Sequence, residues 1–112
     1  MTNTQVKNGC IRISQQAIAK IASSAVQTTN EVTALVEGRI KRTDKKKFFK
    51  AIGIGINEFK LIIEIHPIVR LETPLHQLSR ILQSKVKQEV ELMTGLIVSA
   101  VNIEIVGIHF EE

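Results

Sequence analysis

Five stretches of the chain carry the residue patterns of β-strands, with apolar and polar positions alternating in most of them. These stretches cover residues 11–13, 32–38, 52–56, 59–71 and 96–109. Over residues 52–56 isoleucine alternates with glycine, so this strand has one aliphatic face and one nearly bare face. Asn57-Glu58 then predicts a two-residue turn, because asparagine tolerates positive φ. Pro67 lies within the fourth stretch and cannot donate to a ladder, which predicts an edge position or a bulge.

A period near 3.6 residues predicts two helices. The first covers residues 15–28, and Ser14 is its predicted N-cap because a serine hydroxyl can accept a hydrogen bond from a first-turn N–H. The second starts at Thr73-Pro74, with threonine as the N-cap and proline at the first helical position. It ends before Gly95, where a left-handed glycine is expected.

The predicted order of elements is β-α-β-β-β-α-β, which indicates a two-layer α+β fold. We expect both helices to pack on one face of a mixed or antiparallel sheet. Residues 1–8 are polar and are predicted to form a flexible N-terminus. Residues 9–112 are predicted to form a single domain, with the basic segment 39–50 as an inserted loop.

Charge is concentrated in one segment of the chain. The formal net charge is +4, yet residues 39–50 hold seven basic residues and one aspartate, so this segment contributes +6 and the rest of the chain −2. Burying so many like charges is unfavourable, which predicts an exposed hairpin loop or strand extension. The candidate partner contacts are Arg39, Lys41, Arg42, Lys45, Lys46, Lys47, Phe48, Phe49 and Lys50.

Three kinds of contact compete for this basic segment. It can follow a nucleic-acid backbone with the phenylalanine rings stacked on bases, lie on anionic lipid headgroups, or dock an acidic protein. The fourth interpretation is a solvated loop whose Phe48 and Phe49 close onto the core edge. Burial of the two rings favours this last interpretation, and their exposure beside the lysines favours a contact surface.

No arrangement of side chains predicts catalysis, a metal or a cofactor. Cys10 with His66, His76 or His109 lacks a third group to orient the base, and the histidines are at least ten residues apart with no metal-binding spacing. The glycines at 53 and 55 lack the third glycine of a dinucleotide-binding loop. Glu64 and Glu104 are expected to face solvent. The chain has four Phe and no Trp or Tyr, too few rings for an aromatic-lined ligand pocket.

The single cysteine and the polar N-terminus predict a cytoplasmic protein. Cys10 cannot form an internal disulfide, which fits a reducing compartment. Residues 1–5 do not resemble a signal peptide, and the longest apolar run, 96–108, is shorter than the roughly 20 residues that span a bilayer.

Several short motifs resemble one protein family over residues 9–109. They are Ile11-Arg12-Ile13-Ser14, the Gly-Ile-Gly-Ile strand at 53–56, Met93-Thr94-Gly95, and Val101-Asn102-Ile103. This pattern is similar to that of the alkaline shock protein family, also called the Gls general-stress family. The sequence departs from the family at residues 71–74, where a glycine is usual, and in the basic segment, which is usually a shorter glycine-rich connection.

The resemblance implies an abundant cytoplasmic protein of mainly Gram-positive bacteria, linked to cell-envelope stress and without catalytic residues. Some such proteins sit at the membrane through a separate small anchor protein, and some self-assemble. It therefore predicts a non-catalytic envelope-homeostasis protein that acts through protein contacts or self-association. The alternative is a small RNA- or DNA-binding domain that uses residues 39–50.

Overall fold

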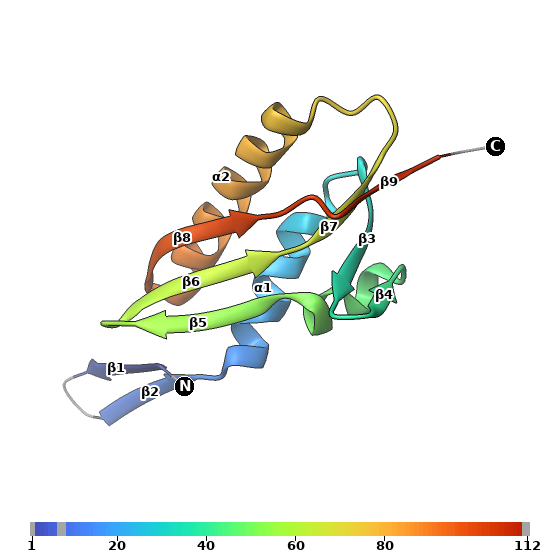
Figure 1. Cartoon of the computed structure of the whole chain (residues 1–112). Coiled ribbons are helices and arrows are strands. Elements are labelled where there is room, and N and C mark those ends of the chain that lie inside the picture. Colours follow the sequence, from blue (N-terminus) through green and yellow to red (C-terminus); the bar gives the residue numbers. More distant parts are fainter. Residues whose placement is uncertain (1, 7–8, 111–112) are drawn as a thin grey trace.

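The computed structural model of the 112-residue chain describes residues 2–6 and 9–110 (Figure 1). It is a mixed α+β fold, as predicted. The strands are β1 (Thr2–Val6), β2 (Gly9–Ile13), β3 (Val32–Glu37), β4 (Ile40–Arg42), β5 (Gly53–Asn57), β6 (Lys60–Ile65), β7 (Pro67–Arg70), β8 (Ile97–Ile103) and β9 (Gly107–His109). The helices are α1 (Gln15–Gln27), the 3-10 helix η1 (Lys45–Ala51) and α2 (Leu75–Thr94).

The sheet is built around the consecutive strands β6 and β7. On one side, β8 and β9 pair with them in parallel; on the other, β5 and β3 pair with them antiparallel. Backbone bonds from Glu104 N to Ile65 O and from Val106 N to Pro67 O bridge the gap between β8 and β9. The prediction of a mixed or antiparallel sheet is therefore resolved as mixed, with β5 and β8 at the two sides of its three-stranded part.

Pro67 interrupts the long central strand instead of marking an edge. The sequence left an edge position or a bulge open, and the edge alternative is wrong, because β7 has β3 on one side and β9 on the other. The break falls at His66, whose carbonyl accepts a hydrogen bond from Val36 N at 2.9 Å. Proline is tolerated here because the ladder is already broken where its missing N–H would be needed.

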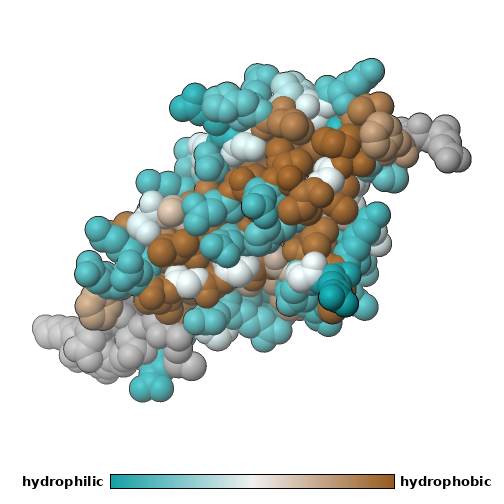
Figure 2. All heavy atoms as spheres, viewed as in Figure 1, coloured by the Kyte–Doolittle hydropathy of each residue, from teal (hydrophilic) through white to brown (hydrophobic). Residues whose placement is uncertain are grey.

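Both long helices pack on the same face of the sheet and against each other (Figure 1). That face supplies the fully buried aliphatic side chains of β6, namely Leu61, Ile63 and Ile65. The opposite face carries a band of hydrophobic residues that remains visible in the space-filling view (Figure 2). By strand alternation this face includes the half-buried Ile62 and Ala100.

The helix ends agree with the sequence signals at two of three positions. Ser14 is the N-cap of α1 and its Oγ accepts from Ala17 N at 3.1 Å. Gly95 ends α2 in the left-handed region, with φ of 72°. The predicted N-cap Thr73 is wrong: α2 starts at Leu75, its cap is Pro74, and no side chain caps it.

The β5–β6 hairpin turns one residue later than predicted. The turn residues are Glu58 and Phe59, with φ of 52° and 67°, and Asn57 pairs with Lys60 as the last rung of the ladder. Two consecutive residues with positive φ define a type I′ turn, in which Asn-Gly is the usual pair. The prediction of Asn57-Glu58 followed asparagine's preference and missed the register that the ladder imposes.

The N-terminal segment also contains regular structure. Within the predicted flexible residues 1–8, β1 pairs antiparallel with β2. Residues 1, 7 and 8 lie outside the described residues. Pairing between two strands does not measure motion, so flexibility of this segment stays a prediction.

Candidate functional site

The basic segment folds into a short strand and a 3-10 helix rather than an open loop. β4 pairs with β3, in line with the predicted strand extension, and η1 follows it. Asp44, the one acidic residue of the segment, caps η1: its carboxylate accepts from Lys46 N at 3.0 Å and its carbonyl from Lys47 N at 2.9 Å. The segment therefore presents its cations from a defined backbone.

Phe48 and Phe49 hold η1 to the body of the protein. Phe48 is completely buried in the main core, so its prediction as a partner contact is wrong: a ring without exposed area cannot stack on a base or touch a partner. Phe49 is half-buried against the same core, and the Lys20 ammonium lies 5.0 Å from the centre of its ring. Such a cation–π contact adds modestly to the packing.

The cationic side chains of the segment remain on the surface. Six of them are exposed: Arg39, Lys41, Lys45, Lys46, Lys47 and Lys50. Lys45 Nζ lies 3.5 Å from the carbonyl of Gln27, at the end of α1. Because Phe48 is buried and Phe49 is half-buried, the two rings fit the interpretation of a solvated loop that closes onto the core edge. The role of the exposed cations as partner contacts stays a prediction, since exposure makes contact feasible without identifying a partner.

Arg42 is the exception, because it is partly enclosed. Its guanidinium forms an ion pair with Glu37 at 3.5 Å, and its Nε is buried without a hydrogen-bond acceptor among the residues that the structure describes. A buried donor without an acceptor is uncommon and unfavourable. Arg42 therefore has hydrogen-bonding capacity that its neighbours in the fold do not use.

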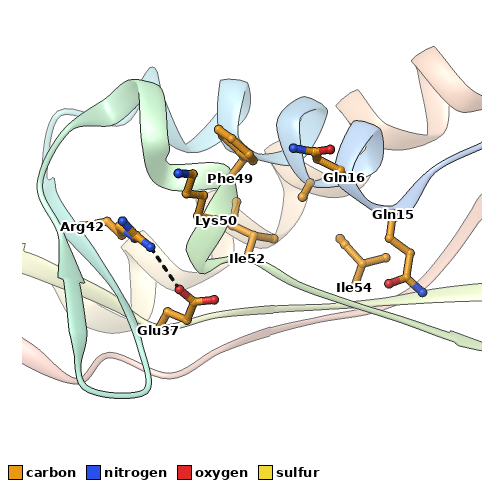
Figure 3. A pocket seen from close by; sticks show the side chains of 9 residues that line it. Gln15, Gln16, Glu37, Arg42, Phe49, Lys50, Ile52 and Ile54 are labelled. Carbon is orange, nitrogen blue, oxygen red and sulfur yellow. Dashed lines mark ion pairs between the residues drawn. The ribbon is translucent and has the colours of Figure 1, made fainter.

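A shallow hollow of about 380 Å³ lies beside Arg42 (Figure 3). Gln15 and Gln16 at the start of α1 line one side of it, and Lys50 and Arg42 line the other. Ile52, Ile54 and Phe49 contribute its apolar surface. Two cations, one carboxylate and two amides therefore surround the hollow, which gives it one more positive than negative charge.

The two sides of the sheet differ in how their backbone is covered. At β8, Glu91 Oε2 of α2 accepts from Val98 N at 2.9 Å, and Gln83 Nε2 donates to Val101 O at 2.9 Å. β5 pairs with β6 alone, and no side chain within residues 12–110 forms an equivalent bond to its backbone. This bare edge was not predicted from the sequence, although an isoleucine–glycine strand without a charged residue was a signal for it.

The residues considered for catalysis or metal binding lie on several different elements. No group of three potential metal ligands occurs in the described part of the chain. His66 lies 3.8 Å from Glu104, while His76 is in α2 and His109 in β9. Glu64 and Glu104 are exposed, as predicted. The side chain of Cys10 lies outside the described residues, so its pairing with a histidine is untested.

None of the helices in the described part of the chain is long and apolar enough to cross a bilayer.

Comparisons with known proteins agree with the resemblance seen in the sequence. The model of the alkaline shock protein 23 family, described as having a cell envelope-related function, matches residues 3–110. The uncharacterized protein YqhY of Bacillus subtilis (strain 168) is 26% identical over 97 residues, which covers 86% of this chain and 72% of YqhY. No solved structure matches the chain. The predicted family is confirmed: this chain belongs to the alkaline shock protein 23 family, whose function is related to the cell envelope.

Proposed function

We propose that this protein is a non-catalytic component of the cell-envelope stress response that acts by binding other proteins or further copies of itself. The observation that carries the proposal is the construction of the basic segment. Its exposed cations stand on an ordered strand and 3-10 helix that Phe48 holds to the core. An acidic partner would meet a preformed surface, which reduces the entropy lost on binding.

The proposed location is the cytoplasm, with attachment to the inner face of the membrane through a partner such as a small anchor protein. The family's cell envelope-related function supports this placement. A basic surface is attracted to the anionic inner leaflet by about 1 kcal/mol per basic residue near the lipid. Such an attraction would hold the protein near a membrane-bound partner.

The nucleic-acid alternative has weaker support than the protein-binding proposal. Binding to single strands without sequence preference relies on aromatic rings that stack on bases. Phe48 is fully buried and Phe49 is half-buried beside Lys20, which leaves the segment without a free stacking ring. The lysines could still follow a phosphate backbone, and this contact would weaken steeply with salt.

The test reverses three charges in η1 with Lys45→Glu, Lys46→Glu and Lys47→Glu. All three side chains are exposed, so the fold should be retained. The control variant reverses the exposed cations Arg70, Arg80 and Lys87, which changes the net charge equally outside the segment. Each protein, crosslinked in cells and purified after nuclease treatment, is assayed for co-purifying envelope proteins, and separately for binding to a labelled RNA at low salt.

We expect the original protein and the control to recover the same envelope protein, and the η1 variant to lose it. The nucleic-acid alternative would be established by a different result. The original protein and the control would then bind RNA, the η1 variant would not, and no envelope protein would be recovered. Equal recovery of the envelope protein by all three would exclude the basic segment as the contact surface.

A further inference from the structure

The outer edge of β5 presents unpaired backbone groups in an alternating pattern. In the type I′ hairpin, Asn57 and Lys60 flank the two-residue turn and form a hydrogen-bonded pair. Hydrogen-bonded and non-bonded pairs alternate along an antiparallel ladder, so Gly55 and Gly53 also bond to β6. The N–H and C=O groups of Ile54 and Ile56 must then point away from β6, where the described residues offer them no backbone partner.

The sequence of β5 is nearly symmetric about Gly55. A second β5 strand that runs antiparallel, with Gly55 opposite its own copy, places Ile54 opposite Ile56 in both directions. The outward N–H and C=O groups of these isoleucines then face one another and satisfy each other reciprocally. β5 holds no charged residue and no proline, so neither repulsion nor a missing donor opposes this pairing.

The ends of β5 are complementary in charge under the same register. Asn57 of the second copy, the last residue of β5, then lies opposite Gly53. The next residue, Glu58, starts the turn on the side of Ile52, which lines the hollow together with Lys50 and Arg42. The carboxylate thereby approaches Lys50 and Arg42, whose two positive charges exceed the single negative charge of Glu37, the ion-pair partner of Arg42. The twofold symmetry repeats this contact at the other end of the pair.

The turn between β5 and β6 has a backbone conformation that its residues, Glu58 and Phe59, do not favour. Glu58 and Phe59 both adopt positive φ, a conformation that is unfavourable for residues other than glycine, asparagine and aspartate. Phe59 is also 85% exposed. Strained backbone that the local sequence does not favour is often found at functional positions. In the paired arrangement this turn projects Glu58 toward the hollow of the second copy.

We propose that two copies of this chain associate by antiparallel pairing of their β5 edges, with Glu58 of each copy seated beside Lys50 and Arg42 of the other. The proposal rests on self-association as one mode of the proposed function and names the surface responsible. A pairing of two five-residue strands is small compared with a standard protein interface. We therefore expect a reversible dimer that exchanges with monomer.

The first test measures association by sedimentation velocity at protein concentrations from about 1 µM to 1 mM. This range covers the dissociation constants expected for a small, weak interface. Glu58→Lys and Lys50→Glu should each weaken the dimer about tenfold or more, because the twofold symmetry places each change at both ends of the interface. The double variant Glu58→Lys/Lys50→Glu should recover most of the lost affinity by restoring the opposite charges. Arg80→Glu, an exposed charge reversal on α2, should leave association unchanged.

The second test reads the backbone directly. Ile56→Pro removes an outward N–H that β6 does not use, so we expect the fold to persist, checked by circular dichroism, while the dimer is lost. In amide exchange followed by NMR, the Ile54 and Ile56 amides should become protected as the concentration rises. The Gly53 and Gly55 amides, which bond to β6, provide the internal control and should be protected at every concentration.

A chain that stays monomeric throughout this range overturns the inference but leaves capture of an envelope protein by the basic segment untouched. Dimers that survive both Ile56→Pro and the single charge reversals would place self-association on another surface and would also overturn it.

Discussion

The edges formed by β8 and β5 belong to the same three-stranded part of the sheet but differ in protection. At β8, the neighbouring helix α2 supplies a carboxylate for Val98 N and an amide for Val101 O. At β5, the outward groups of Ile54 and Ile56 have no backbone partner among the described residues and no such side-chain cover from residues 12–110. Unpaired edges invite pairing with another chain, and folds usually block them with charges, prolines or covering elements.

The difference teaches that edge protection in this fold is provided by particular side chains and not by the sheet itself. Glu91 and Gln83 lie two turns apart on α2, on the side that meets β8. α1 provides Gln15 and Gln16 near β5, but these amides line the hollow and form no hydrogen bond with the strand. The edge at β8 is covered by side chains of its helix, whereas the edge at β5 has no such cover from residues 12–110.

The largest expected effect comes from weakening the helix that covers β8. Leu82 on α2 is fully buried, and Leu82→Ala should reduce the free energy of unfolding by about 3 kcal/mol, through lost burial and a residual cavity. Urea unfolding measures the change. Leu92→Ala on the same helix is the control, because Leu92 is 82% exposed and its loss should change stability by less than about 0.5 kcal/mol. Equal effects of the two variants would contradict the packing described for α2.

A smaller effect is expected when the cover itself is removed. Glu91→Ala deletes a charge-assisted bond to Val98 N and should reduce the free energy of unfolding by about 1.5 kcal/mol. It should also raise self-association by opening a second edge. Glu91→Gln keeps an acceptor oxygen at the same length and should lose less stability. If Glu91→Ala neither destabilises the protein nor increases its association, the contrast between the two edges is not functional.

The smallest effect has the opposite sign and concerns the turn at the open edge. Replacing Glu58-Phe59 by Asn-Gly should raise the free energy of unfolding by about 1 kcal/mol, because asparagine and glycine adopt the positive φ of this turn with little strain. The same variant should weaken the proposed dimer, since it removes the Glu58 carboxylate. Thermal unfolding of dilute protein measures the first result and sedimentation the second. A dimer strengthened in parallel with stability would exclude a role for Glu58.

Local signals in the sequence predicted much of the fold. Ser14 and Gly95 mark helix ends through their own side chain or lack of one, so four or five neighbouring residues suffice to recognise them. The strand containing Pro67 was recognised as well, but not its central position. Strand order depends on contacts between distant residues, which alternation along one strand does not reveal.

The candidate site was harder to predict, because its features depend on packing. Adjacent phenylalanines look equivalent in the sequence, yet Phe48 is fully buried and Phe49 half-buried, since successive side chains of η1 point in different directions. The Glu58-Phe59 turn contradicts the usual preference for asparagine and glycine, so no local rule identifies it. The bare edge of β5 becomes evident only when its neighbours are known.

The burial of Phe48 separates two selection pressures within a single seven-residue helix. The ring is constrained by volume, because it fills space in the core, while the lysines around it face water and make few contacts within the chain. Surface substitutions of this kind usually change stability by no more than about 0.5 kcal/mol. Positive charge can thus be added or removed here without refolding the domain, whereas the position of Phe48 requires a large apolar residue to fill its space in the core.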